Sequence, residues 1–270
     1  MAKAKSAFVC TECGAEYSKW QGQCSSCREW NTLSEVRLGS ARPHAPAPST
    51  TGRSGYAGLV SREVVDLGEV DLTEVPRFSS TFGEFDRVLG GGLVPGSAVL
   101  LGGNPGAGKS TLLLQTACKL AQSHKVLYVT GEESLSQVAM RAHRLQLPVK
   151  GLNMLAETSI ETVLAVAERE KPAVLIIDSI QTMHLEDISS APGGVAQVRE
   201  SSAALTRFAK QSNTVLMLVG HVTKDGTLAG PKVLEHMIDA SLLLEGGADS
   251  RFRTLRGQKN RFGAVNELGV

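Results

Sequence analysis

The stretch that decides the fold is Gly103-Asn104-Pro105-Gly106-Ala107-Gly108-Lys109-Ser110, followed by Thr111. It comes directly after a short apolar run at 98–101 and directly before a segment of helical period at 109–122. This is the Walker A pattern in its required strand–loop–helix setting. Glycines let consecutive backbone N–H groups face a phosphate, and the helix N-terminus adds its positive end. We therefore expect residues 103–111 to bind a nucleotide, with Lys109 on the β and γ phosphates and the Ser110 hydroxyl on Mg²⁺.

The chain around this loop alternates apolar runs with helix-like segments. Apolar runs lie at 98–101, 126–129, 173–177, 214–219 and 240–244, and segments of helical period lie at 109–122, 135–145, 160–170 and 195–211. Continuous apolar strands joined by crossover helices are typical of a mostly parallel sheet with helices on both faces. The sequence thus predicts an α/β protein with a P-loop NTPase core.

Carboxylates follow two of the expected strands. Asp178 comes after the run at 173–177 and has the setting of a Walker B aspartate, which holds Mg²⁺ through its water shell. Glu132 and Glu133 follow the run at 126–129, and one carboxylate there would polarise the attacking water. We favour Glu132 as the general base, with Glu133 as the substitute. A solvated Glu133 beside a helix cap is the alternative.

His221 follows the run at 214–219. In P-loop proteins with a separate catalytic glutamate, this strand is inserted between the Walker A and Walker B strands. The tip of the strand would then lie beside the γ phosphate, where His221 would act as a sensor. A histidine in a surface turn is the alternative.

Four of the five cysteines form two Cys-x-x-Cys pairs, Cys10 with Cys13 and Cys24 with Cys27. In a reducing compartment this spacing indicates a closed, structural Zn²⁺ site. We expect Trp20, on the loop between the pairs, to pack against this module rather than to contact a partner or DNA. A stretch rich in Pro, Ser and Gly follows. We therefore predict a zinc module at 1–36, a flexible linker at 37–59 and an ATPase domain at 60–270.

Composition limits the other function classes. The 28 Lys and Arg nearly balance the 27 Asp and Glu, so any nucleic-acid site must be a local patch. With 42% hydrophobic residues the chain can build a core, and no apolar run approaches a membrane span. The first residues lack a secretory signal, so a cytoplasmic location is expected. A small-molecule kinase is disfavoured because no arginine cluster resembling a lid lies between the Walker motifs.

Several motifs together resemble the bacterial RadA family of RecA-like DNA repair ATPases. They are the paired cysteines, Phe82-Gly-Glu-Phe-Asp-Arg-Val-Leu-Gly-Gly-Gly92, the Walker A loop, Thr130-Gly-Glu-Glu-Ser134 and, most specifically, Lys259-Asn-Arg-Phe-Gly263. The resemblance covers nearly the whole chain and implies a RecA-like core that binds ATP and ADP. It also implies ring hexamers that bind single-stranded and branched DNA and drive branch migration or unwinding alongside the RecA recombinase. The family usually continues into a Lon-protease-like domain, which this sequence is expected to lack.

The resemblance also assigns residues to the assembled ring. Lys259 and Arg261 resemble the pair that RecA-type subunits insert into a neighbour's ATP site, where such cations contribute about 10³–10⁵ in rate. The loops at 183–194 and 223–232 correspond to DNA-binding loops, with Lys224 and Lys232 in the second and Arg199 nearby. The loops contain no aromatic residue, so backbone contacts with strong salt dependence are expected.

Two functions share every one of these motifs. The first is a motor, a DNA-stimulated ATPase that moves strands. The second is an ATP-gated DNA-binding or scaffold module, in which nucleotide orders the ring but DNA is held without translocation. The basic strip at 251–261 fits either, and a solvated strand edge protected by cations is its structural alternative.

Overall fold

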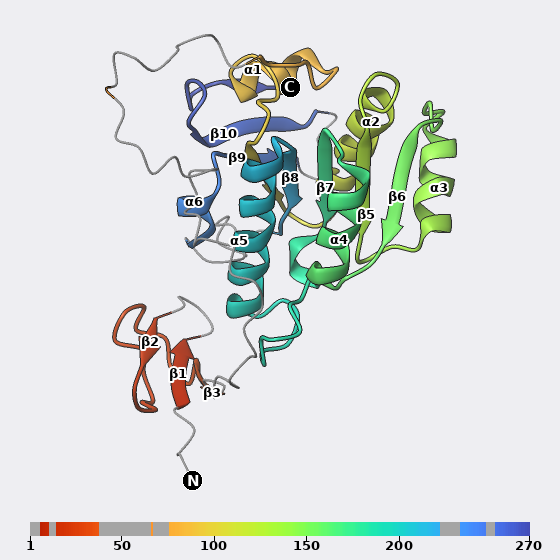
Figure 1. Ribbon diagram of the computed structural model, residues 1–270. Helices are drawn as coiled ribbons and strands as arrows, with labels where there is room; N and C mark the ends of the chain where they lie inside the picture. The colour runs from red at the N-terminus through yellow and green to blue at the C-terminus, as the bar shows by residue number, and fades with distance from the viewer. Residues whose placement is uncertain (1–5, 11–14, 38–65, 67–75, 222–232, 247–251) are drawn as a thin grey trace.

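The computed structural model describes residues 6–10, 15–37, 66, 76–221, 233–246 and 252–270 (Figure 1). The helices are α1 (Gly83–Leu89), α2 (Lys109–Leu120), α3 (Leu135–Arg144), α4 (Ile160–Glu170), α5 (Val195–Ser212) and α6 (Val233–Met237), with a 3₁₀ turn, η2, at Ile180–Thr182. The strands of the large sheet are β4 (Ala98–Gly103), β5 (Val126–Thr130), β6 (Leu152–Ala156), β7 (Val174–Asp178), β8 (Val215–Val219), β9 (Ala240–Glu245), β10 (Thr254–Asn260) and β11 (Leu268–Gly269). A separate small sheet at the N-terminus contains β1 (Ser6–Cys10), β2 (Glu16–Tyr17) and β3 (Leu33–Arg37).

The large sheet has the order β11-β10-β9-β4-β8-β7-β5-β6. The six strands from β9 to β6 are parallel, and β10 and β11 return antiparallel at one edge. β8 lies between the Walker A strand β4 and the Walker B strand β7, as expected from the sequence. The predicted α/β class with a mostly parallel sheet is confirmed.

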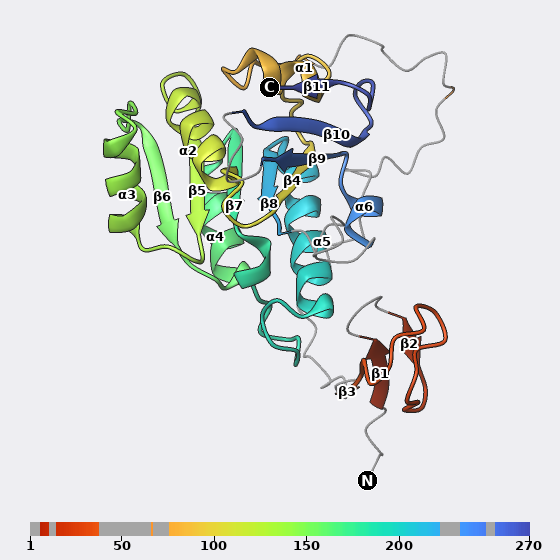
Figure 2. The same cartoon turned by 180° about the vertical axis from the view of Figure 1, so that it is seen from behind.

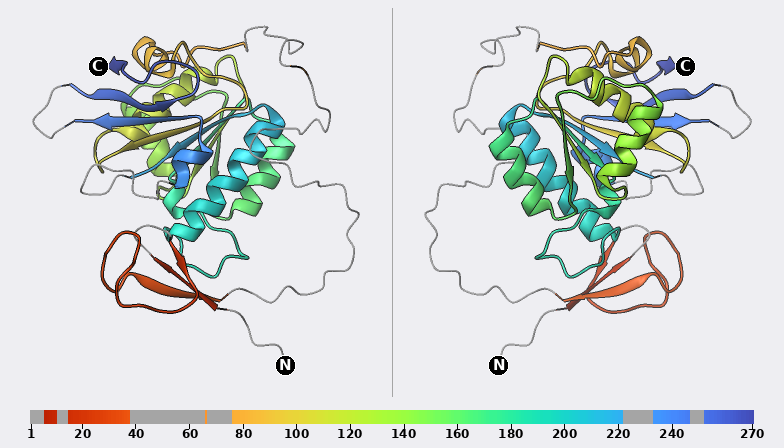
Figure 3. Two further views of the ribbon diagram at one scale, coloured as in Figure 1. Left: turned by 90° about the vertical axis from the view of Figure 1, so that its left-hand side faces the viewer. Right: turned by 90° about the vertical axis from the view of Figure 1, so that its right-hand side faces the viewer.

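Helices cover both faces of this sheet (Figures 1 and 2). Side chains alternate along each strand, so on β5 Val126 and Tyr128 join the core under α1, α2 and α3, whereas Leu127 and Val129 join the core under α4, α5 and α6. The side views in Figure 3 show the helices as two layers with the sheet between them. This layering brings the carboxyl ends of the parallel strands to one edge, where α/β proteins bind their ligands.

The sequence analysis missed five helices and strands of the large domain, namely α1, β6, α6, β10 and β11. β6 is an edge strand with half-exposed residues, so it has no continuous apolar run. α1 is only seven residues long, and β10 is a strand with alternating burial in the basic strip. The predicted linker at 37–59 lies outside the described residues except for Arg37, which ends β3. The domain boundaries therefore remain predictions.

Candidate functional site

The phosphate loop follows β4 without a break. Gly106 and Gly108 have φ values of 78° and 104°, in the left-handed region that side chains rarely adopt. Their conformation turns the loop so that α2 begins at Lys109, with its free N–H groups facing the loop. The loop therefore has the backbone form of an anion site at a helix N-terminus.

Lys109 is folded into this loop. Its Nζ donates hydrogen bonds to the carbonyl oxygens of Gly103 at 2.7 Å and Asn104 at 3.0 Å, and the residue is only 5% exposed. Burial lowers the pKa of Lys109, and the negative charges of Asp178 and Glu132 oppose that shift. The ammonium thus binds the phosphate loop directly and experiences the negative charge of the two carboxylates predicted to take part in the chemistry.

The predicted Mg²⁺ ligands lie together. Ser110 Oγ donates a hydrogen bond to Asp178 Oδ1 at 3.1 Å, although the two residues are 68 positions apart in the chain. Asp178 ends β7 and is 7% exposed. Burial raises its pKa, and hydrogen bonds from Tyr128 and Ser110 lower it. A hydroxyl and a carboxylate are the hard oxygen ligands that Mg²⁺ prefers, so these residues fit that ion.

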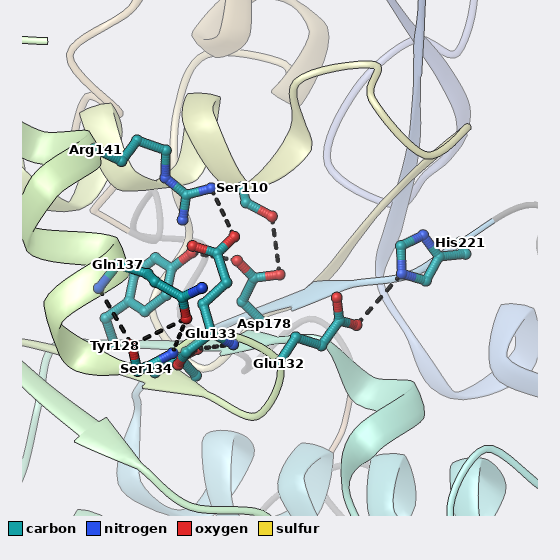
Figure 4. Close-up of polar contacts among 10 residues, drawn as sticks. Ser110, Tyr128, Glu132, Glu133, Ser134, Gln137, Arg141, Asp178 and His221 are labelled. Atoms are coloured by element: carbon teal, nitrogen blue, oxygen red, sulfur yellow. Dashed lines mark hydrogen bonds and ion pairs between the residues drawn. The ribbon is translucent and has the colours of Figure 1, made fainter. Parts of the chain in front are cut away.

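The two adjacent glutamates point in different directions (Figure 4). Glu132 Oε1 accepts a hydrogen bond from the Ser179 hydroxyl and lies 3.4 Å from His221 Nε2. Glu133 forms an ion pair with Arg141 at 2.9 Å on the α3 side. The neighbouring strand ends therefore bring Asp178, Glu132 and His221 to one edge, while Glu133 turns toward the helix.

Sequence reasoning missed three members of this site. The Tyr128 hydroxyl donates a hydrogen bond to Asp178 Oδ2, the Ser179 hydroxyl contacts Glu132, and Arg141 holds Glu133. A tyrosine in the otherwise aliphatic run at 126–129 was the available signal for the first, because a buried phenol needs a partner. The position of Arg141 on a helix that looked ordinary carried no such signal.

Lys259 and Arg261 lie at the opposite edge of the sheet from the phosphate loop. β10 pairs Lys259 with Ser241 and Asn260 with Ala240, at the start of β9. β9 in turn pairs Ser241 with Leu100 and Ala240 with Val99 of β4, so Lys259 and Asn260 are level with points three and four residue steps before Gly103, about 10 and 13 Å at 3.3 Å per residue, and lie two strands away from β4. The two cations are therefore remote from the Walker A loop of their own subunit.

Local contacts hold this cationic pair in place. Lys259 Nζ donates to the carbonyl oxygen of Ile238 at 2.7 Å, and Arg261 Nη1 lies 3.3 Å from Asp239 Oδ1. Asp239 is 2% exposed, and its Oδ2 accepts from Lys210 at 2.8 Å and from the Ala98 N–H at 3.0 Å. The buried carboxylate thus links Arg261 to α5 and to the start of the Walker A strand.

The candidate DNA-binding residues are described only in part. Lys224 and Lys232 lie outside the described residues. Arg199 lies in the first half of α5, where its Nε is 3.0 Å from Glu200 Oε1. The buried side chain of Gln197, on α5, reaches back to the loop at 183–194. It accepts a hydrogen bond from the N–H of Leu185 and donates to the carbonyl oxygens of residues 185, 188 and 190. This loop is therefore tied to the helix that follows it.

Three of the four predicted zinc ligands form one cluster. The sulfur atoms of Cys10, Cys24 and Cys27 lie within 4.8 Å of one another, and those of Cys10 and Cys27 are 3.6 Å apart. Four thiolates at about 2.3 Å from a zinc ion lie about 3.8 Å apart, so the spacing fits tetrahedral Zn²⁺. Cys13 lies outside the described residues.

The aromatic residues of the zinc module behave differently from the prediction. Trp20 is 57% exposed and Trp30 66%, and both rings flank Gly22. Trp20 lies against Gly22 of the module but is not part of its small core, which is filled by Phe8, Tyr17, Leu33 and the cysteines, so more than half of the side chain stays exposed. Cys118, in contrast, is fully buried on α2 and is a core residue as predicted.

Comparison with known proteins assigns the family. Residues 69–227, more than half of the chain, match the AAA domain family, and residues 8–35 match the rubredoxin metal binding domain. The chain belongs to the AAA domain family. The AAA domain implies ATP and Mg²⁺ as the ligands of the phosphate-loop site, and the rubredoxin-type module implies Zn²⁺ at the cysteines, as predicted.

Curated relatives support the resemblance found in the motifs. The chain is 66% identical over 271 residues to DNA repair protein RadA of Escherichia coli, 64% identical to that of Haemophilus influenzae and 45% identical to that of Bacillus subtilis. Each alignment covers 100% of this chain and 58% of the relative. The similarity to RadA proteins is therefore confirmed, over a little more than half of their length.

A solved structure supports the fold alone. The crystal structure of a KaiC-like protein from Pyrococcus horikoshii has a TM-score of 0.60 and 20% identity, and the match covers 72% of this chain and 92% of that one. Among the described residues, no helix has the length and hydrophobicity needed to cross a bilayer.

Proposed function

We propose that this chain is a DNA-dependent ATPase of recombinational DNA repair. It binds single-stranded DNA and drives branch migration or unwinding of recombination intermediates as a ring hexamer, together with the RecA recombinase, in the bacterial cytoplasm where its DNA lies. The observation that carries the proposal is the presence of a phosphate-loop site at the carboxyl ends of the strands and of two cations toward their amino ends. The name of its relatives, DNA repair protein RadA, supports the DNA substrate.

Hydrolysis assigns a role to each residue at the strand ends. The loop residues 103–111 bind the phosphates through backbone N–H groups, and Lys109 moves from its two loop carbonyls to the β and γ phosphates. Ser110 and Asp178 hold Mg²⁺, which neutralises phosphate charge when it is bound. Glu132 orients and deprotonates the attacking water.

Contacts of the glutamates support Glu132 as the base. The Ser179 hydroxyl and His221 both contact Glu132, and its charge acts on Lys109. Glu133 is engaged by Arg141 and lies on the other side of the strand end. In this arrangement His221 links the base to β8, which suits a residue that senses the γ phosphate.

A neighbouring subunit completes the site in this proposal. Lys259 and Arg261 lie two strands from β4, toward its amino end, and are held there by local contacts, so in this proposal their role in hydrolysis is exerted in trans. A charge brought to the γ phosphate from a second copy stabilises the transition state and makes hydrolysis depend on assembly. The buried Asp239 supports this role, because it fixes Arg261 at the edge of the subunit.

DNA binding is assigned to the loops at 183–194 and 223–232, with Lys224, Lys232 and Arg199 as the cations. These loops follow the strands β7 and β8, whose tips carry Asp178 and His221. In this proposal, hydrolysis of the γ phosphate is connected to the DNA contacts through the chain that leads from Asp178 and His221 into these two loops. The exposed Trp20 and Trp30 leave the role of the zinc module open to a protein or a DNA partner.

The alternative is an ATP-gated DNA-binding scaffold without translocation. Strand displacement on a branched substrate distinguishes the two functions when ATP is compared with a slowly hydrolysed analogue. The motor requires displacement with ATP and little with the analogue, whereas equal displacement with both refutes it. Sedimentation with and without ATP and single-stranded DNA tests the ring itself, because the proposal requires assembly in their presence.

A further inference from the structure

A buried tyrosine lies behind the Walker B carboxylate. Tyr128 is on β5 and is 0% exposed, and its hydroxyl donates a 2.5 Å hydrogen bond to Asp178 Oδ2. The other oxygen, Oδ1, accepts the hydrogen bond from Ser110. The two oxygens of one carboxylate are therefore held by two different donors, one from the core and one from the phosphate loop (Figure 4).

The register of the sheet explains how the phenol reaches this carboxylate. Tyr128 pairs with Ile176 of β7, two residues before Asp178, so both side chains lie on the α2 and α3 face. The other residues of β5 before Thr130 are aliphatic, and a phenylalanine would satisfy the packing as well. A buried hydroxyl without a hydrogen-bond partner destabilises the fold by about 1–3 kcal/mol. The bond to Asp178 removes this cost, so the hydroxyl of Tyr128 is explained by the carboxylate and not by packing.

A buried cation lies next to this pair. The Arg141 side chain on α3 is 15% exposed, and its Nη1 binds Glu133 at 2.9 Å. Its Nε and Nη2 atoms are buried without a hydrogen-bond partner among the described residues. The guanidinium therefore engages Glu133, whereas the two oxygens of Asp178 are held by Tyr128 and Ser110.

We propose that Tyr128 is a positioning residue for the Mg²⁺ site. It fixes Oδ2 of Asp178 so that Oδ1 faces the metal beside Ser110. The inference deepens the proposed ATP site and rests on the assignment of Asp178 to the metal. It does not depend on DNA, on assembly or on hydrolysis.

The test is metal binding by Tyr128→Phe, which removes one oxygen and keeps the ring. We expect the Mg²⁺ concentration that half-saturates binding of a fluorescent ATP analogue to rise roughly tenfold, equivalent to about 1.4 kcal/mol. Affinity for the same analogue in EDTA should not change. Electron paramagnetic resonance of Mn²⁺ should show the same weakening with nucleotide present.

Thr116→Val is the matched control. This hydroxyl is also buried, but it bonds Leu112 within α2, so its loss tests stability without touching the metal ligands. Unchanged metal affinity in folded Tyr128→Phe overturns the proposal, as does an equal loss of nucleotide affinity with and without metal. If Tyr128→Phe does not fold, Tyr128→Leu makes the same test with the aliphatic type of side chain found in the rest of β5, and its unchanged metal affinity counts against the proposal. Failure of DNA-stimulated hydrolysis with these metal results intact would refute the motor and leave the role of Tyr128 standing.

Discussion

Replacing each of the two adjacent glutamates separately tests the most specific assignment in the ATP site. Glu132→Gln removes the carboxylate that contacts Ser179 and His221 but keeps the size of the side chain. Glu133→Gln is its matched control, because it makes the same chemical change one residue further along. Only the first substitution removes the proposed general base.

The contacts set different magnitudes for the two variants. Loss of a positioned general base lowers the hydrolysis rate by about 10²–10⁴. Glu133 is 36% exposed at its side chain, so its ion pair with Arg141 contributes at most about 1 kcal/mol, or roughly fivefold. Loss of this ion pair affects the position of α3 and not the attacking water molecule. We therefore expect at least a tenfold gap between the two variants.

The assay is single-turnover hydrolysis of labelled ATP with protein in excess over nucleotide. Binding of a fluorescent ADP analogue is measured alongside, because neither glutamate is assigned to phosphate binding. Both variants should bind nucleotide as the wild type does. A Glu133→Gln variant as slow as Glu132→Gln, or a Glu132→Gln variant within fivefold of wild type, refutes the assignment.

Three further predictions concern the phosphate loop, the cationic pair and the zinc module. Lys109→Ala should abolish ATP-dependent activity, and retained hydrolysis would contradict the role of the loop. Lys259→Ala should bind nucleotide normally but lower turnover of assembled protein by about 10³ or more, whereas the exposed Arg256→Ala on the same strand should stay near wild type. Chelation of Zn²⁺ should change tryptophan emission, since Trp20 and Trp30 are the only tryptophans of the chain, while far-ultraviolet helix signal persists. An emission spectrum insensitive to the chelator would count against the metal site.

Local patterns were sufficient to predict the ATP site. The strands that lead into the two Walker motifs, β4 and β7, are buried on both faces, so they appear in the sequence as continuous apolar runs. Residues 103–111 contain the glycines that the phosphate loop requires. β6 escaped because an edge strand is only half buried. The role of Tyr128 was not predicted because its partner, Asp178, lies 50 residues away and the two meet only through the pairing of β5 with β7.

The arrangement of the cations could not be predicted from the sequence. Lys259 lies in β10 and Arg261 follows it, so the antiparallel pairing of β10 with β9 fixes where in the sheet both cations lie. The choice between Glu132 and Glu133 likewise depends on which direction each side chain takes. Arg141, eight residues beyond Glu133 on α3, decides that direction.

A subunit-mixing measurement tests most directly the claim that two chains build one ATP site. Lys109→Ala lacks a working phosphate loop, and Arg261→Ala lacks the cation that one subunit supplies to the ATP site of its neighbour. Each variant alone should therefore be inactive. In assembled mixtures with DNA, some interfaces join the intact phosphate loop of one subunit to the intact Arg261 of its neighbour. These interfaces should restore part of the ATPase activity, with a maximum near equal proportions of the two variants. Mixtures that stay as inactive as the separate variants, or Arg261→Ala protein with wild-type turnover, would contradict the account.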